Sequence, residues 1–125
     1  MKYDQFVTAV AERAGVTRDE AETLTRATLR VLAERLSAGE AEDLRAQLPK
    51  ELKGELVSPQ EEAQAFGPRE FARLVAERAG TDEVAARAAV AAVLTTLRDA
   101  VTSGEFDDVL AQLDNDFAAL VDAGK

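Results

Sequence analysis

Apolar positions along the chain recur at helical spacing. Phe6, Val10 and Ala14 fall on one face of a first predicted helix, from about Asp4 to Ala14, because residues three or four positions apart meet on a helix surface. A longer second helix is expected to run to about Ser37, with one stripe made of Ala21, Thr25, Thr28, Leu29, Leu32 and Leu36. This periodicity predicts an all-α fold.

Glycine and capping residues separate these segments. Gly15 is expected to end the first helix in the left-handed conformation, and Thr17 with Glu20 forms a capping box that starts the second. Gly39 is expected to end the second helix, and a short third helix follows, from Glu40 to about Gln47.

Proline marks the connection that comes next. Pro49 stands where a further short helix would begin, at the first helical position. Ser58 to Glu61 forms another capping box, which predicts a brief helix to Ala65. Gly67 and Pro68 then end a linker expected over residues 57–67.

The helical pattern occurs twice. VAERAG is found at Val10–Gly15 and again at Val75–Gly80, an offset of 65 residues, and the same offset aligns GEAEDLRAQL at Gly39–Leu48 with GEFDDVLAQL at Gly104–Leu113. Two distant matches in one ungapped register indicate a duplicated unit, over residues 3–56 and 68–121. We therefore predict a single helical domain, residues 1–125, in which two repeated three-to-four-helix units form a compact bundle about a pseudo-two-fold axis.

The first unit resembles a known family. Gly39-Glu40-Ala41, Asp43-Leu44 and Leu48-Pro49 match the GEA-x-DL-x-x-x-LP segment that is the hallmark of domain-of-unknown-function family 2267 in bacteria and archaea, whose helical unit is often duplicated. The second unit is less similar, since Phe106 and Asp114 depart from the pattern. The resemblance implies an all-helical fold and no particular activity. A fainter likeness, to histone-like DNA-bending proteins of the HU type, is confined to the opening helices and implies similar packing only.

Composition removes several function classes. The 125 residues include no cysteine and no histidine, so thiolate nucleophiles, sulfur-ligated metals and histidine-based catalysis are excluded. With 24 acidic and 15 basic residues, the net charge of −9 repels phosphate backbones and anionic membranes, which disfavours nucleic acid as a partner. No signal peptide follows Met1 and no apolar stretch is long enough to cross a bilayer, so we expect a cytoplasmic protein.

Paired carboxylates are the first candidate for chemistry. Glu40 and Asp43 lie three residues apart on the predicted third helix and recur as Glu105 and Asp108. Such pairs can perform acid–base work, but their recurrence in both units favours a role in folding. We expect Glu40 and its counterpart to cap the third helix of each unit.

The repeated arginines are the expected partners of the aspartates. Arg13 is predicted to approach Asp43, and Arg78 to approach Asp108, because the repeat keeps both members at the same separation. The alternative is that these candidate residues contact an anion or a protein partner.

A cation site is the next candidate. Asp107-Asp108 and the segment Asp114-Asn115-Asp116 could bind calcium or magnesium, but no EF-hand loop surrounds them, and a solvated acidic helix end is favoured. We expect no metal, no cofactor and no catalytic residue.

The second long helix differs from the first in having no charge from Ala88 to Leu97. A helix that is apolar on all sides is usually enclosed, so its larger residues are expected in the core: Val90, Val93, Leu94 and Leu97. Its small residues are expected against the first unit, which we favour, or against a second copy in a homodimer: Ala88, Ala91, Ala92 and Thr95. If Ala91, Ala92 and Thr95 were open, they would form a candidate interaction surface.

The function favoured by the sequence is that of a non-enzymatic interaction or structural protein, a monomer or homodimer with a protein partner. Two alternatives remain. One is an enzyme that uses carboxylates, which would need a concave pocket with convergent buried acids. The other is an HU-like nucleic-acid binder, which would show salt-dependent binding to DNA.

Overall fold

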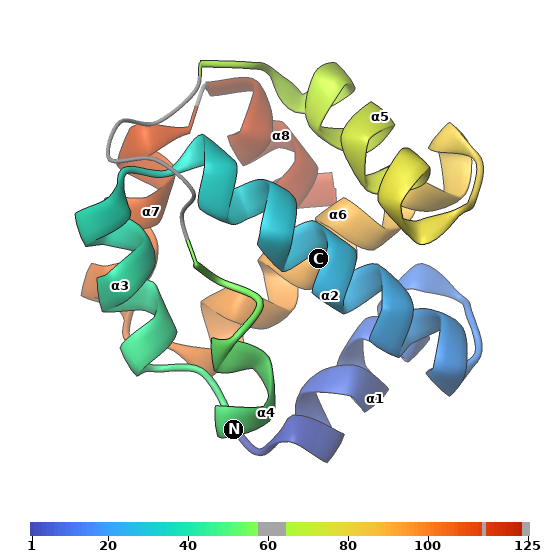
Figure 1. Cartoon of the computed structure of the whole chain (residues 1–125), viewed down its shortest axis with the longest axis horizontal. Helices are drawn as coiled ribbons and strands as arrows, with labels where there is room; N and C mark the ends of the chain where they lie inside the picture. The colour runs from blue at the N-terminus through green and yellow to red at the C-terminus, as the bar shows by residue number, and fades with distance from the viewer. Residues whose placement is uncertain (58–64, 114, 124–125) are drawn as a thin grey trace.

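The computed structural model describes residues 1–57, 65–113 and 115–123. Among these residues it contains helices and their connections, and no strand. They are α1 (Tyr3–Ala14), α2 (Arg18–Arg35), α3 (Ala38–Ala46), α4 (Lys50–Lys53), α5 (Pro68–Ala79), α6 (Glu83–Ala100), α7 (Ser103–Gln112) and α8 (Asn115–Ala123). The predicted all-α fold is confirmed, and the helices pack as one compact body (Figure 1). The helix expected after Ser58 lies outside the described residues.

Most of the helix ends predicted from glycine, proline and capping residues agree with the structure. Gly15 and Gly80 end α1 and α5 with φ of 70° and 68°, the left-handed conformation that glycine adopts without a steric penalty. The Thr17 hydroxyl accepts from the Glu20 amide, and the Glu20 carboxylate accepts from the Thr17 amide, which forms the predicted capping box. Pro68 occupies the first turn of α5.

Two predicted boundaries are wrong. Gly39 does not end the second helix, because α2 already ends at Arg35 and Leu36 is extended. Ser37 then starts α3 by accepting a hydrogen bond from the Glu40 amide, so Gly39 lies inside α3. A serine in extended conformation satisfies a free amide and therefore sets this boundary more strongly than the glycine two residues later. Pro49 is the residue before α4 and not its first helical residue.

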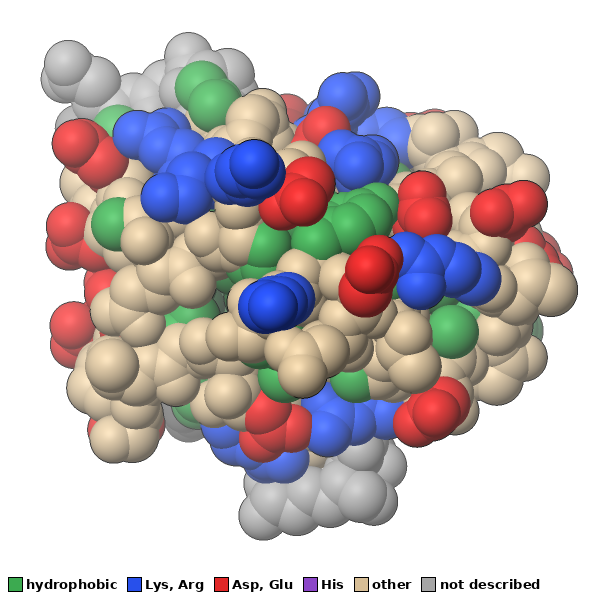
Figure 2. Space-filling view, turned by 90° about the horizontal axis from the view of Figure 1, so that it is seen from below, with side chains coloured by type: hydrophobic (Ala, Val, Ile, Leu, Met, Phe, Trp, Pro, Cys, Tyr) green, Lys and Arg blue, Asp and Glu red, His purple; other side chains and the backbone are tan. Residues whose placement is uncertain are grey.

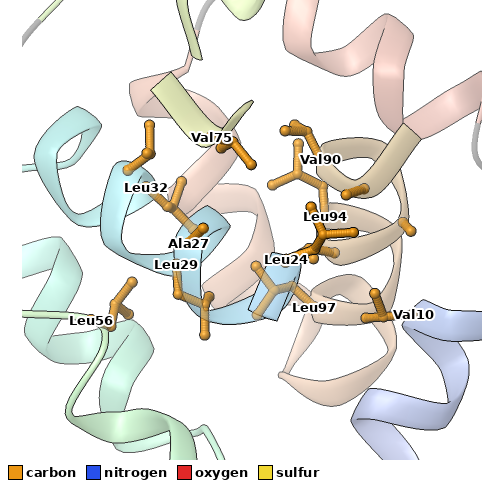
Figure 3. Close-up of a cluster of buried hydrophobic side chains, with 14 of the residues drawn as sticks. Val10, Leu24, Ala27, Leu29, Leu32, Leu56, Val75, Val90, Leu94 and Leu97 are labelled. Atoms are coloured by element: carbon orange, nitrogen blue, oxygen red, sulfur yellow. The ribbon is translucent and has the colours of Figure 1, made fainter. Parts of the chain in front are cut away.

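The two units share one core. α1 packs against α6 of the second unit as well as against α2, and α5 packs against both α2 and α6. Figure 3 shows the result: Leu29 and Leu32 of α2 lie in one cluster with Val75 of α5 and with Leu94 and Leu97 of α6. All five side chains are fully buried. Each unit therefore completes its core with helices of the other.

α6 is the most enclosed helix, since it contacts α1, α2, α5, α7 and α8. The predicted core residues Val90, Val93, Leu94 and Leu97 are all buried. Of the small-residue face, Ala92 and Thr95 are 2% and 1% exposed, so these two residues are enclosed within the chain. None of the described helices has the length and apolar character needed to cross a bilayer.

The expectation for Ala88 is wrong within the chain. Ala88 is exposed and Ala91 is half-buried. Arg13 of α1 contacts Thr96 and Asp99, in the last turns of α6.

Candidate carboxylate site between the two units

The arginine–aspartate pairs predicted within each unit are not formed. Arg13 donates instead to Thr96 Oγ1 at 2.9 Å and to Asp99 Oδ2 at 2.6 Å. Arg78 forms its ion pair with Glu34, at 2.6 Å between Nη2 and Oε2. Both predictions were wrong for the same reason: α1 and α5 pack against the long helix of the opposite unit, which brings each arginine to a carboxylate there.

These two contacts are counterparts. Glu34 and Asp99 are 65 residues apart, as Arg13 and Arg78 are. Arg13 of the first unit thus contacts Asp99 of the second, while Arg78 of the second contacts Glu34 of the first. Each arginine joins the two units.

A second reciprocal contact lies at the starts of α3 and α7. Gln47 Oε1 accepts from the Thr102 amide at 2.8 Å, and Gln112 Oε1 accepts from the Ser37 amide at 2.8 Å. Ser37 and Thr102 are the residues that start α3 and α7, and they too are 65 positions apart. Each glutamine therefore stabilises the helix start of the other unit.

The sequence predicted that Glu40 and Glu105 cap these helices, but their side chains do not do so. Their amides donate to the hydroxyls of Ser37 and Thr102, at 3.3 and 3.2 Å. Their carboxyl groups take no part in these two caps. α3 packs against α7 (Figure 1), and the two glutamates face each other between these helices, with exposed fractions of only 9% and 8%.

Four acidic residues gather at this contact, which we call the carboxylate site: Glu40 and Asp43 of α3 with Glu105 and Asp108 of α7. Carboxylate oxygens of Glu40, Asp43 and Glu105 lie within 4.8 Å of one another. Oε2 of Glu40 and Oε2 of Glu105 are buried without a hydrogen-bond partner in the described part of the chain. The two aspartates are exposed.

The surroundings disfavour the charged form of Glu40. Burial is the largest cause, and the hydrogen bond to Glu105 and the negative charges of Glu105, Asp108 and Asp43 add to it, so that the pKa of Glu40 rises to about 8. Near neutral pH, Glu40 can therefore hold a proton. The same oxygen atoms could instead bind a hard cation, which prefers carboxylate ligands.

The site does not coincide with a surface hollow that the described residues form. The hollow beside α2 and α5 has a volume of about 300 Å³ and is lined by Asp19, Glu20, Thr23, Leu24, Ala79, Gly80 and Thr81. Others lie beside Met1–Asp4 and beside Arg69 and Arg87, and neither Glu40 nor Glu105 lines any of them. These hollows therefore lie apart from the buried acids.

The remaining candidates from the sequence lie apart from the carboxylate site. Thr95 Oγ1 donates to the Ala91 carbonyl at 2.7 Å, within α6. Ala92 and Thr95 are covered by the chain itself, so a partner could reach only Ala91 and its exposed neighbours on this face.

Sequence reasoning missed the pairing of Glu40 with Glu105 and the roles of the two glutamines. One signal was present: Glu40, Asp43 and Gln47 are identical in both units, whereas their neighbours Ala41 and Glu42 are replaced. The identity showed that these residues matter to the duplicated unit. It did not show that their partners belong to the other unit.

The model of one protein family, described as "Uncharacterized conserved protein (DUF2267)", matches residues 3–120. The chain belongs to this family. The match covers nearly the whole of the DUF2267 chain, in agreement with the resemblance seen in the sequence. The family's description assigns no activity, and no curated protein matches the chain.

Proposed function

We propose that this DUF2267 protein is a non-enzymatic structural or interaction protein, built from two units related by a pseudo-two-fold axis. One observation carries the proposal: the polar residues that recur in both units join one unit to the other. Arg13 and Arg78 form reciprocal ion pairs, and Gln47 and Gln112 form reciprocal helix-start contacts. Groups that a catalyst would direct at a substrate are here used to hold the two units together.

The enzyme alternative finds less support. Buried acids do converge, at Glu40 and Glu105, but their Oε2 atoms are shielded from solvent by the protein. A general acid or base must come within hydrogen-bonding distance of the group it serves. A substrate could approach only after α3 and α7 had separated.

The nucleic-acid alternative also finds less support. On the face shown in Figure 2, basic side chains are interspersed with acidic ones and do not form a continuous basic stripe. Arg18, Arg26, Arg30 and Arg73 are engaged in ion pairs with carboxylates of the chain. A phosphate backbone would have to compete with these carboxylates and with a net charge of −9. The proposal keeps the cytoplasmic setting expected from the sequence.

The proposal can be tested with the intact, tagged chain, cross-linked in its native host and purified. A protein recovered in a fixed ratio to the chain, or a dimer by sedimentation velocity, is the expected result. The Glu40→Gln/Glu105→Gln double variant should give the same recovery, because in this proposal the acids are structural.

Two results would contradict the proposal that the protein is neither an enzyme nor a nucleic-acid binder. One is the conversion of a compound in a metabolite extract, followed by mass spectrometry, that the wild-type chain performs and the double variant does not. The other is a mobility shift of DNA or RNA that weakens as salt is raised.

A further inference from the structure

The oxygen atoms of the carboxylate site have the spacing of a cation's coordination shell. Calcium binds oxygen at about 2.3–2.6 Å, so that ligands on opposite sides of the ion lie about 4.6–5.2 Å apart. The corresponding limit for magnesium, which binds at about 2.0–2.1 Å, is about 4.0–4.2 Å. One carboxylate oxygen each from Glu40, Asp43 and Glu105 lie within 4.8 Å of one another. The spacing is compatible with calcium, whose ligands can lie farther apart than those of magnesium.

The buried oxygens point independently to a ligand. The residues Glu40 and Glu105 are more than nine-tenths buried, and apart from the contact between the two carboxyl groups themselves, Oε2 of each has no hydrogen-bond partner among the residues described. A buried polar atom without a partner costs about 1–3 kcal/mol, and more if it is charged. In native proteins such atoms are usually satisfied by a group, a water or an ion.

The electrostatic balance distinguishes a cation from a proton. A proton on Glu40 would neutralise one of the four negative charges and leave the other three. No lysine or arginine of the described chain forms an ion pair with any of these four acids. A divalent cation would neutralise two of the four charges.

We propose that Glu40, Asp43 and Glu105 bind one calcium ion between α3 and α7, with Asp108 supplying further negative charge at the rim. The two glutamates form the buried side of the site. Asp43 and Asp108 are exposed, so the ion reaches the site from their side and completes its shell there with water. The site departs from the expectation of no metal in the sequence analysis, because its ligands come from two helices that are 65 residues apart.

Calcium bound in this way would link the two units. Glu40 and Asp43 belong to the first unit and Glu105 to the second. The ion would therefore add one more contact between the units to those made by the arginines and glutamines. The inference goes beyond the proposed function and does not depend on the identity of a protein partner.

The test is a titration of the intact, chelator-treated chain with calcium chloride, by isothermal titration calorimetry and by thermal unfolding. One calcium ion per chain and a rise in the unfolding midpoint are expected. Glu40→Gln and Glu105→Gln should each abolish saturable binding and the rise in midpoint. Glu42→Gln is the matched control: it removes the same charge from an exposed position of α3 and should bind as the wild type does.

Circular dichroism of each variant shows whether it is folded. Glutamine has nearly the shape of glutamate, and an amide can donate to the remaining carboxylate, so both variants should fold. The absence of saturable calcium binding by the wild type, or equal binding by Glu40→Gln and Glu42→Gln, would overturn the proposal. Magnesium chloride that binds as tightly as calcium chloride would overturn the choice of ion.

Discussion

At the scale of single residues, the buried carboxyl group of Glu40 couples the stability of the fold to pH. Its pKa in the folded chain is about 8, above the ordinary value of 4.5 that applies on unfolding. Between these two values the folded chain binds more protons than the unfolded chain. The free energy of unfolding therefore falls as pH rises from 4.5 to about 8, and this contribution becomes constant above that range.

Glu40→Gln should remove this dependence. Relative to the variant, the wild type should lose on the order of 4 kcal/mol of unfolding free energy between pH 5 and about 8.5, since each pKa unit corresponds to about 1.4 kcal/mol. Urea unfolding in the presence of a chelator, followed by circular dichroism, measures both profiles. Glu42→Gln should follow the wild type, and parallel profiles for wild type and Glu40→Gln would show that the carboxyl titrates normally.

At the scale of helices, α2 and α6 have the same length and aligned positions but different surroundings. Where α2 carries Arg26 and Arg30, which reach Glu55, α6 carries Ala91 and Thr95. The small side chains on α6 allow neighbouring helices to approach closely. Protein interiors are packed to crystal-like density, so little space is left for a larger residue there.

Position along α6 should therefore decide the effect of enlarging an alanine. Ala92→Leu should destabilise the protein by about 1–3 kcal/mol, because Ala92 is enclosed and extra methyl groups force their neighbours to move. Ala88→Leu, on the exposed turn, should change stability by less than about 0.5 kcal/mol. Chemical unfolding of the two variants gives the comparison, and equal losses would mean that both positions are packed alike.

At the scale of the whole molecule, the first helix of each unit is fastened to the long helix of the other. The Arg13–Asp99 pair is reinforced by the hydrogen bond to Thr96, whose side chain is fully buried. In the Arg78–Glu34 pair, the glutamate side chain is 21% exposed. Pairs that are partly shielded from water contribute more than fully exposed ones.

Double-mutant cycles can locate these interactions. Substitution of Arg13 and Asp99 by alanine should give a coupling free energy of about 0.5–1 kcal/mol, and the Arg78–Glu34 cycle a similar value. Arg13 with Asp43 and Arg78 with Asp108 should show almost no coupling, since these residues do not pair. Coupling within a unit and none between units would contradict the packing of α1 on α6.

Secondary structure followed from the sequence because it depends on neighbours a few positions apart. Amides need capping partners within one turn, and left-handed helix ends need glycine, so Thr17, Gly15 and Gly80 could be interpreted without knowledge of the fold. The burial of Val90, Val93, Leu94 and Leu97 also followed, since a helix without charges has no face suited to water.

The partners of the repeated polar residues were decided by tertiary structure alone. In a duplicated chain, repeated residues can pair either within each unit or with the other unit, and both arrangements keep the same residues at the same offset. The recurrence of Arg13 and Arg78 is therefore compatible with both. Only the packing of α1 on α6 and of α5 on α2 determines that each arginine pairs with the other unit. The same holds for Glu40 and Glu105: the sequence placed each near a helix start, and only the approach of α3 to α7, driven by the burial of apolar residues, brought their carboxyl groups together.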